Sequence, residues 1–507
     1  MGDSATVLSV IFGYLALCLV LGILPGRRAS ETTTGYVAGD RSLGLVMLYF
    51  ITGASVFSAF AFLGGPGWAY SRGVAVLYIL GYGVFGLLPF YFLGPRAARV
   101  GRRYGFVTQA EMVAARFQMP AIAGIMALVS VAAFVPYLAL QMKGAGYVLS
   151  VVTHGEIPEW MGAAGVYGVV LVYLLASGVL GVGWTNTFQG IFMMVLAWAL
   201  GLWVPYQLYG GVGAMFTEIA AQRPELLDPP GLSASGAPWN WGEYTTAVIV
   251  STIGFSCWPH LFMRAFSARD DRTIRRTVVL YPTFQIFLIP IFLIGFAGVL
   301  FEGSSPDKAD QILPHLLMNM PEVPALLVGL FCAGALAASM SSGDAMAHAA
   351  ASIAVRDGMV VAGKKRTTPV AERNMIRWLL VAVIVSSYLV AMAYRGSLVT
   401  LLLASYGGIV QFAPVLVVTL YTRRVTGPGV LAGLVVGTVV TVAFTVMPGW
   451  RPWAIHAGVY GLVMNLAALA LVSARGSGVG GDDEFLAVAG GDIETEELSV
   501  RGDSVGG

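Results

Sequence analysis

Charge and cysteine are both scarce in this chain. Only 11% of its 507 residues are Asp, Glu, Lys or Arg, about half the share of a typical soluble protein. The three cysteines, Cys18, Cys257 and Cys332, all lie in apolar stretches, which excludes a disulfide framework and a cysteine-based zinc site. No short cleavable leader is evident, because the first apolar run, Thr6–Leu24, is long enough to remain as a membrane helix.

Apolar runs of membrane-spanning length recur along nearly the whole chain. Hydrophobic residues make up 57% of the sequence, and about 20 apolar residues suffice for a helix to cross a bilayer. The sequence therefore predicts an all-α polytopic membrane protein with thirteen spans. They cover roughly residues 5–24, 42–65, 74–94, 121–151, 163–182, 187–208, 243–266, 277–301, 323–352, 376–394, 398–421, 428–447 and 454–473.

Successive loops are alternately rich and poor in basic residues, and this pattern predicts the orientation of the chain in the membrane. With the N-terminus outside, 23 of the 29 lysines and arginines fall on the inner side, and only five fall on the outer side. Positive residues favour cytoplasmic loops. The bias predicts an outside N-terminus, a cytoplasmic C-terminus and an odd number of spans. The membrane domain covers 1–475, and the acidic, Gly-rich segment 476–507 is expected to be a disordered cytoplasmic tail.

One strongly apolar span contains an unexpected set of polar residues. In AASMSSGDAMAH (337–348), the residues Ser341, Asp344, His348 and the following Ser352 are spaced three, four and four apart, so they form one stripe of a helix. Ser341 and the neighbouring Ser342 offer hydroxyl oxygens, which hard cations prefer. The serines alone are more often a close-packing device. Asp344 favours a functional reading, because intramembrane acids usually face a cavity or a partner.

Two spans contain features that suit an interrupted helix. The centre of 42–65, Ile51-Thr-Gly-Ala-Ser55, is a candidate for unwinding, which would expose backbone carbonyls to cations. Pro259 interrupts the span at 243–266 after a run of polar and aromatic residues. The simpler alternatives are a small-residue packing face for the first and a proline kink for the second.

Two further positions have both a structural and a functional reading. Thr185 or Asn186, in GWTNTFQ, could cap the start of a helix. Lys143 is the only lysine inside a span; it could bind an anionic substrate, pair with Asp344, or extend its ammonium group to the membrane interface.

Six motifs in a fixed order resemble the sodium:solute symporter family, whose members transport proline, pantothenate, monocarboxylates and sugars. They are GASVFSAFAFLGGPGWAYSRG (53–73), RRYGFVTQAEMVAARF (102–117), WTNTFQ (184–189), WPHLFMRAF (258–266), AASMSS (337–342) and GGIVQFAPVLVVTLYTRRVTGPGVLAGLVVG (407–437). The run PYLALQMKGAGYV (136–148) looks most like the pantothenate and monocarboxylate branch. The resemblance covers about 10–475 and implies a leucine-transporter-type five-plus-five inverted repeat, with core repeats at about 42–208 and 243–421.

The resemblance also implies positions for the ligands. A sodium ion would bind the carbonyls of Ala54, Phe57 and Ala338 and the hydroxyls of Ser341 and Ser342. A substrate would lie beside the interrupted helices, and the implied contacts are Ser55, Val56, Ser58, Tyr137, Gln141, Phe255, Trp258, Pro259 and Gln411, with Lys143 as a further candidate.

The chain departs from the family pattern in its carboxylates. Many relatives have an aspartate where Asn186 stands, some have one at Val56, and many have a small hydroxylic residue at Asp344. Asn186, Asp344 and His348 are therefore candidates for a role in coupling or ion exit. We hypothesise that Asp344 either draws sodium toward the cytoplasm or allows a proton to take part.

The expected function is sodium-coupled symport of a small organic solute across the plasma or inner membrane, with sodium as the co-transported ion. A monocarboxylate or a pantothenate-like carboxylate is the favoured solute. The alternatives are a proline-type amino-acid symporter, proton-coupled uptake through Asp344, and a membrane solute sensor. We expect neither an enzymatic activity nor a nucleic-acid partner, and the sequence leaves the oligomeric state open.

Overall fold

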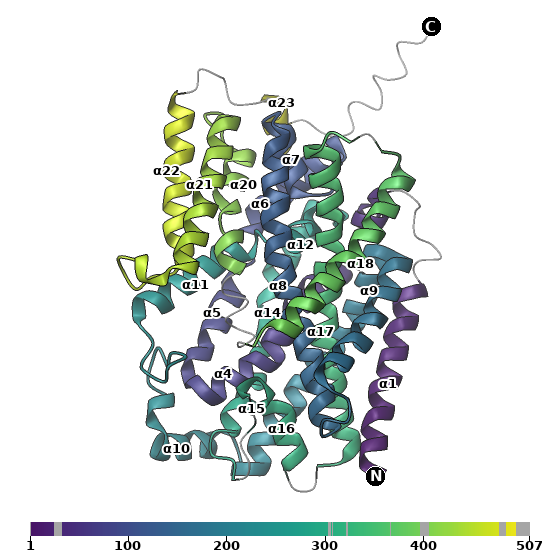
Figure 1. The fold of residues 1–507 in the computed structure, drawn as a ribbon, viewed down its shortest axis with the longest axis vertical. Helices are drawn as coiled ribbons and strands as arrows, with labels where there is room; N and C mark the ends of the chain where they lie inside the picture. The colour runs from purple at the N-terminus through teal and green to yellow at the C-terminus, as the bar shows by residue number, and fades with distance from the viewer. Residues whose placement is uncertain are drawn as a thin grey trace.

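The computed structural model describes residues 2–24, 33–302, 306, 308–320, 323–365, 367–395, 405–475 and 483–492. Within these ranges the chain is helical, with two isolated β-bridges, Leu43–Ala268 and Leu232–Pro238. The helices form an elongated bundle (Figure 1). Helix α1 begins at one end of its long axis and α23 lies at the other, as an odd number of crossings requires (Figure 1).

The helices in chain order are α1 (Gly2–Ile23), α2 (Thr33–Ala38), α3 (Leu45–Val56), a π-helical turn (Phe60–Gly64), α4 (Gly65–Arg72), α5 (Leu77–Phe85), α6 (Phe90–Tyr104), α7 (Gln109–Arg116), α8 (Pro120–Val152), α9 (Glu159–Tyr209), α10 (Val212–Gln222), α11 (Trp241–Phe255), α12 (Pro259–Phe262), α13 (Arg264–Ser267), α14 (Asp271–Gln285), α15 (Leu288–Ala297), α16 (Ile312–Asn319), α17 (Ala325–Ile353) with its π-helical extension Ala354–Ala362, α18 (Pro369–Ala393), α20 (Phe412–Tyr421), α21 (Gly427–Val446), α22 (Ala457–Arg475) and α23 (Asp483–Gly490).

Each of the thirteen predicted spans coincides with described helix. Eight helices are long and apolar enough to cross a membrane, and two bent pairs bring the number to ten. The first bent pair extends from Leu45 to Phe85, so it overlaps both the second and the third predicted span. The second arm of α9 and the shorter helix Ser405–Tyr421 overlap two more. Residues 398–404 of the eleventh predicted span lie outside the described residues.

Both predicted interruptions are present, and the first lies slightly later than expected. Helix α3 continues through Ile51–Ser55 and ends at Val56, after which the chain bends by 55°. Ser58 N–H turns back to the Val56 carbonyl, and the helix restarts from Ser58. The second pair bends by 40° after Phe255. Trp258 is extended there (φ −57°, ψ 125°), because the residue before a proline is disfavoured in the helical region.

A glycine divides α9 into two arms. Gly178 has φ +56°, and a Cβ there would lie 2.6 Å from the Tyr36 carbonyl oxygen. Tyr173 and Thr185 lie on opposite sides of it, yet both contact the same oxygen of Asp344. Twelve residues of straight helix span about 18 Å, so the chain must fold back at Gly178. The predicted helix cap at Thr185 or Asn186 is wrong, because both residues lie inside the second arm.

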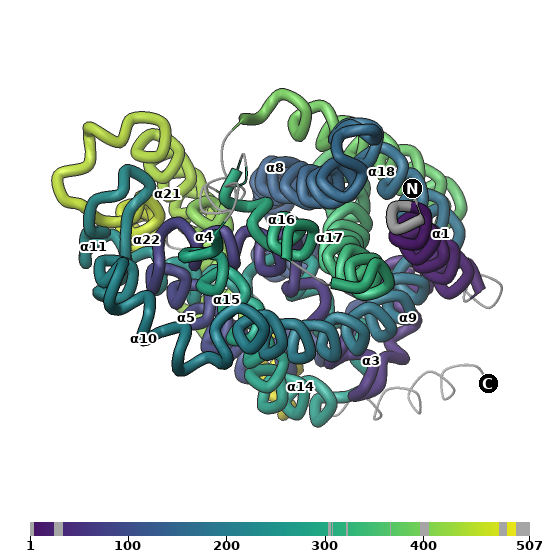
Figure 2. The backbone as a smooth tube through the Cα atoms, turned by 90° about the horizontal axis from the view of Figure 1, so that it is seen from below, coloured from purple at the N-terminus to yellow at the C-terminus, as the bar shows by residue number. Residues whose placement is uncertain are grey.

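Helix α17 is the central element of the bundle. In its most apolar stretch 78% of the residues are buried, against 33% for α1, α18, α21 and α22. It packs against α9, α8, α1 and α3, and Figure 2 shows it enclosed by other helices. The polar stripe from Ser341 to Ser352 is therefore buried inside protein, away from lipid.

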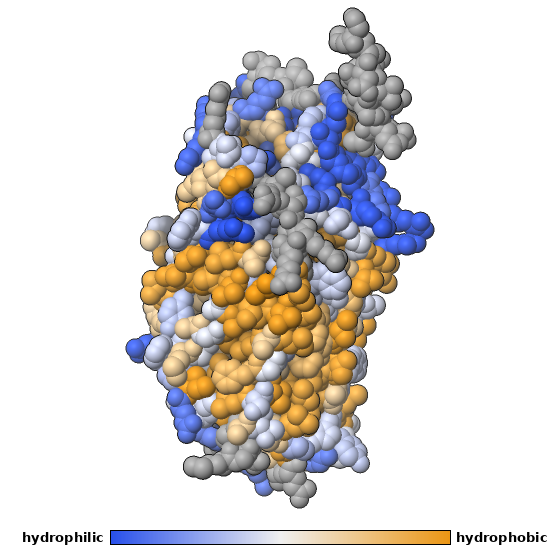
Figure 3. Space-filling model, turned by 90° about the vertical axis from the view of Figure 1, so that its right-hand side faces the viewer, coloured by the Kyte–Doolittle hydropathy of each residue, from blue (hydrophilic) through white to orange (hydrophobic). Residues whose placement is uncertain are grey.

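The distribution of apolar and hydrophilic residues on the exterior is that of a membrane protein. Apolar residues form a broad band over the face in Figure 3, and hydrophilic residues gather at the end of the long axis where α23 lies. Exposed tryptophans such as Trp198 and Trp378 belong to this surface.

The prediction of a wholly disordered tail is wrong for residues 483–492, where the chain forms α23 and a turn. Phe485 is 3% exposed and stacks on Tyr104 of α6, with the ring centroids 5.8 Å apart. Arg99 Nη1 donates to the carbonyls of Ala489 and Gly490, at the C-terminal end of α23, where a helix end has unsatisfied acceptors. Residues 476–482 and 493–507 of the predicted tail lie outside the described residues.

Candidate substrate and cation site

The predicted cation ligands converge where α3 ends beside the middle of α17. Ser341 Oγ lies 2.9 Å from the Ala54 carbonyl oxygen and 3.3 Å from that of Ala338. Phe57 is the first residue beyond α3. Three predicted ligands are thus in direct contact, although they come from segments nearly 290 residues apart in sequence.

The hydroxyl of Ser342 is the observation in this region that most directly indicates a cation site. Its Oγ is fully buried and has no hydrogen-bond partner among the described residues. A buried polar atom without a partner lowers the stability of the fold by about 1–3 kcal/mol. A ligand that uses the Ser342 hydroxyl would explain why the protein has a serine here. Hydroxyl and carbonyl oxygens are the ligands of hard cations, and the set of residues present fits a sodium ion.

Asn186 ties the second arm of α9 to this cluster. Its Nδ2 donates to the Ser341 carbonyl at 3.1 Å and to Ser55 Oγ at 3.3 Å. Its Oδ1 is buried and unpartnered within the part of the chain that the structure describes. Ser55 Oγ donates to the Ile51 carbonyl of its own helix and accepts from Asn186 of α9. The structure groups Ser55 with the cation ligands, whereas the sequence suggested a substrate contact.

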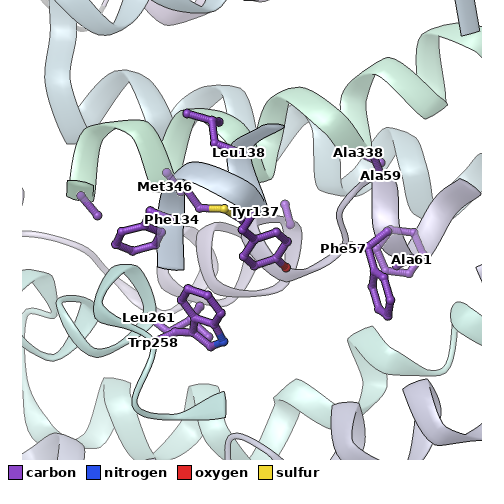
Figure 4. Packing of buried hydrophobic residues seen from close by; sticks show 14 of the residues in the cluster. Phe57, Ala59, Ala61, Phe134, Tyr137, Leu138, Trp258, Leu261, Ala338 and Met346 are labelled. Atoms are coloured by element: carbon purple, nitrogen blue, oxygen red, sulfur yellow. The ribbon is translucent and has the colours of Figure 1, made fainter. Parts of the chain in front are cut away.

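The candidate substrate region lies between the two interrupted helices and α8. Gln141 Oε1 accepts the Ala59 N–H at 2.8 Å, immediately after the first interruption. The Tyr137 ring lies 5.2 Å from that of Trp258, in the second interruption. Figure 4 shows Tyr137 between Trp258 and the turn at Phe57. Gln141 Nε2 is a buried donor left without an acceptor among the described residues.

The other predicted contacts divide between this region and its edges. Ser58 is buried at the first interruption, and Phe255 and Pro259 flank the second. Val56, the last residue of α3, is only partly buried and packs against the apolar core. Aromatic neighbours that sequence reasoning missed complete the wall: Phe134, Tyr82, Tyr281 and Tyr406.

Two predicted substrate contacts lie elsewhere. Lys143 Nζ donates to the carbonyls of Ala391 and Tyr394, near the end of α18, and does not reach Asp344. Gln411 lies where α20 meets α21 and α22. Its Nε2 bonds Thr441 Oγ1 and the Gly458 carbonyl, and its Oε1 accepts from the amide of another side chain. These partners occupy Gln411 at a helix junction.

Asp344 is held one turn beyond the cation ligands. Its Oδ2 accepts hydrogen bonds from Tyr173 OH at 2.8 Å and Thr185 Oγ1 at 3.2 Å. Its Oδ1 is buried and has no partner in the described ranges. The partners Tyr173 and Thr185 were missed from the sequence, because only the fold at Gly178 brings both arms of α9 to α17.

His348 continues the stripe toward α2. Its Nε2 lies 3.1 Å from the Tyr36 carbonyl oxygen, and the two rings are 5.2 Å apart. Ser352 Oγ bonds the His348 carbonyl within the helix. The stripe therefore links the cation ligands to the segment around Tyr36 through side chains of one helix.

A polar cation cluster and a group of buried aromatic side chains, called the chamber below because it is the candidate substrate site, thus lie beside two broken helices. The model of the sodium:solute symporter family matches residues 36–437. The chain belongs to this family. The resemblance seen in its motifs is thereby confirmed.

Individual relatives are distant and cover nearly the whole chain. "Uncharacterized symporter YhjB" of Bacillus subtilis (strain 168) is 28% identical, over 92% of this chain and 96% of the relative. A monocarboxylate transport permease protein of Rhizobium johnstonii is 24% identical, over 93% and 97% of the two chains. The sodium/pantothenate symporter of Escherichia coli (strain K12) is 24% identical, over 85% and 88%.

The fold is that of a solved transporter. The structure of a Na+-coupled sialic acid symporter, in its substrate-bound outward-open state, superimposes with a TM-score of 0.76 at 18% identity, over 94% of this chain and 98% of that chain. The predicted fold class, an all-α membrane protein with a leucine-transporter-type core, is confirmed.

Proposed function

We propose that this protein is a sodium-coupled symporter that imports a small organic carboxylate. The observation that carries the proposal is the cluster at the end of α3, where Ser341 Oγ contacts the carbonyls of Ala54 and Ala338 beside Ser342 Oγ, which has no partner in the described part of the chain. Family membership and the sodium coupling of similar proteins support the choice of ion.

The cluster supplies a simple coupling mechanism. A sodium ion bound by Ala54, Phe57, Ala338, Ser341 and Ser342 would hold the interrupted helix α3 against α17. The chamber wall at Ala59, directly after the interruption, is bonded to Gln141. Sodium would therefore preorganise the substrate contacts, and each ligand would raise the affinity for the other. Rocking of the core would then expose the site to alternate sides.

The solute class rests on the chamber and on the relatives. Ser58, Tyr137, Gln141 and Trp258 supply polar atoms and an aromatic wall to a small organic molecule. Similarity to a monocarboxylate permease and a pantothenate symporter favours a carboxylate. A neutral or zwitterionic amino acid is the second choice.

The position of Asp344 favours a mechanism in which its carboxylate helps sodium to leave the site. The carboxylate lies one turn from Ser341 on the same helix and keeps one oxygen unpartnered among described groups. We assign it the task of drawing sodium toward the cytoplasmic exit, along the stripe that continues to His348. Protonation of Asp344 in place of sodium binding is the alternative.

The orientation proposed is an outside N-terminus in the plasma membrane. It follows from the bias of 23 basic residues to five between the two sets of loops. The end of the bundle that contains α10, α15 and α16 is then the outer end, and the end with α23 is cytoplasmic (Figure 1).

Uptake into proteoliposomes tests the proposal. The panel contains labelled pyruvate, lactate, acetate, pantothenate, proline, alanine and glucose, each with an inward sodium gradient and again with only a proton gradient. We expect concentrative uptake of a carboxylate under the sodium gradient. Accumulation under the proton gradient alone would move the coupling role to Asp344, and accumulation of no solute under either gradient would contradict symport.

A further inference from the structure

A polar pocket of about 480 Å3 lies at the proposed outer end of the bundle, away from the chamber described above. Its walls come from α4, from the loop that follows α10 and from the segment before α16. Three basic side chains line it, Arg72, Lys308 and Arg395, against one acid, Asp310. The pocket therefore has an excess of positive charge, in a chain whose proposed outer loops have few basic residues.

Arg72 is held in place within this pocket. Its guanidinium carbon lies 3.8 Å from the centroid of the Trp68 ring and 4.7 Å from that of Trp239. Its Nε donates to the Leu232 carbonyl at 2.6 Å. Two aromatic contacts and one hydrogen bond fix the planar group, which is the arrangement that makes arginine an effective carboxylate binder.

Two lysines lie near Tyr147, another residue that lines the pocket. Lys308 Nζ lies 4.6 Å from the centroid of that ring, and Lys143 Nζ lies 5.7 Å from it. Lys308 also pairs with Glu159 at 3.1 Å. With Lys143 counted beside the three lining cations, four positive charges face three acids: Asp310, Glu159 and Glu243, whose Oε2 accepts from the Trp239 ring beside Arg72. The lysine that the sequence offered as a substrate ligand thus contributes its charge to the edge of this pocket.

A continuous series of aromatic rings joins the pocket to the chamber. Successive ring centroids are separated by 4.9 to 6.1 Å. The rings in order are those of Trp68, Tyr78, Tyr82, Tyr406, Trp258 and Tyr137. Trp68 lines the pocket and Tyr137 belongs to the candidate substrate region, so a series of aromatic contacts connects the two.

We propose that this outer pocket is a binding site for the carboxylate group of an organic anion before the anion enters the chamber. The proposal rests on the proposed function and deepens it, because it commits the transported solute to negative charge. A cleft lined by one sign of charge raises the local concentration of an oppositely charged solute and its association rate. Arg72 supplies directional hydrogen bonds, and Lys308 and Arg395 supply the attractive field.

The first experiment removes the two exposed charges together. The double variant Lys308→Gln, Arg395→Gln leaves the stacked Arg72 intact. Initial sodium-driven uptake of pyruvate and pantothenate is measured at low and high ionic strength, with glucose as an uncharged probe and alanine as a zwitterion without net charge. At low ionic strength we expect the KM for the transported anion to rise about 3- to 10-fold with an unchanged maximal rate. At high ionic strength we expect the difference to vanish.

A matched control uses Arg223→Gln. Arg223 begins the loop after α10, at the same proposed outer end, and pairs with Glu225 at 2.6 Å, but it does not line the pocket. This variant should keep the KM of the wild type. An equal KM in the double variant and the wild type at low ionic strength overturns the proposal, as does transport of a neutral solute alone. Neither result would contradict symport itself.

A second measurement does not depend on transport. Saturable binding of labelled pantothenate and pyruvate to the purified protein is measured in sodium-free choline buffer, where the chamber is not preorganised. We expect weak binding to the wild type and its loss in the double variant, with the two proteins melting at the same temperature. Absence of binding to the wild type, or equal binding to both proteins, overturns the outer site even if no solute is accumulated in the uptake assay.

Discussion

Two buried polar clusters in this protein differ in how completely their hydrogen bonds are made. Around Gln411, at the junction of α20, α21 and α22, the amide of the glutamine bonds Thr441 and the Gly458 carbonyl and accepts from Asn465. Around Ser341, polar atoms of Ser342, Asn186 and Asp344 remain unpartnered among the described residues.

The difference distinguishes a structural contact from a binding site. A cluster that joins helices gains most when every donor has an acceptor, and in the Gln411 cluster one atom, Asn465 Oδ1, is left over. The cluster at α17 retains several such atoms, which is costly unless a ligand uses them. The resemblance to the family implied ligand contacts in both clusters. The hydrogen bonds favour a ligand-binding role for the cluster around Ser341 and a structural role for the cluster around Gln411.

Removal of the Ser341 hydroxyl should have the largest effect. Ser341→Ala deletes the one side-chain oxygen that contacts both Ala54 and Ala338. We expect the sodium concentration for half-maximal uptake to rise about tenfold or more, which corresponds to a loss of roughly 1.4 kcal/mol in ion binding. Ser342→Ala should act in the same direction. Uptake measured against sodium concentration in proteoliposomes gives the value.

Ser130→Ala is the control for this pair. Ser130 is buried in α8, and its hydroxyl bonds only the Met126 carbonyl of its own helix. Its sodium dependence should equal that of the wild type. Wild-type sodium dependence in both Ser341→Ala and Ser342→Ala would remove the proposed cation site.

Asp344→Asn should have the next largest effect. The change removes the charge beyond the cation ligands and keeps the size of the side chain, so Tyr173 and Thr185 retain an oxygen acceptor. We expect a lower maximal uptake rate, about 3- to 30-fold, since a buried charge that interacts with a cation is worth on the order of 1–2 kcal/mol. Uptake is measured as a function of both pH and sodium.

The two dependences separate the two roles of Asp344. A reduced rate with an unchanged pH profile supports the sodium-exit role, and a lost pH dependence supports a proton. Transport with unchanged rate, pH profile and sodium dependence would refute any coupling role. Ser352→Ala, further along the same stripe and bonded within its own helix, is the matched control.

Gln411→Leu should affect stability and leave sodium coupling intact. The substitution removes four side-chain hydrogen bonds at a helix junction, those to Gly407, Thr441, Gly458 and Asn465, which should destabilise the fold by about 1–3 kcal/mol. Thermal unfolding of the purified protein gives the loss, and uptake gives the sodium dependence. A shifted sodium dependence in this variant would break the distinction between the two clusters.

Release of the tail helix should have the smallest effect. Phe485→Ala removes the stacking on Tyr104 and the contact of the Arg116 guanidinium with the ring at 5.5 Å. We expect faster proteolytic cleavage of the C-terminal segment and no change in sodium dependence, because this docking involves none of the cation ligands. Leu466→Ala, at an exposed position of α22, serves as the control. Cleavage at an unchanged rate would contradict docking of α23 in solution.

Much of the architecture follows from the sequence for a simple reason. A helix that crosses a bilayer needs a long apolar run, whatever its neighbours are, so the long apolar helices could be located from composition alone. Pro259 predicts the second interruption because proline restricts the residue before it and cannot continue the backbone hydrogen bonding. The stripe on α17 follows from its spacing along one helix.

The tertiary structure alone decided which polar residues act together. The spacing of residues shows which side chains share a helix face, but the partner across the interface depends on packing between segments far apart in the chain. Asp344 meets Tyr173 and Thr185 only because α9 folds back at Gly178. Lys143 and Gln411 are polar residues in apolar spans, as Asn186 is. Sequence could not tell that other groups of the protein bond the first two, whereas Asn186 Oδ1 lies close to the cation ligands with no partner among the residues that the structure describes.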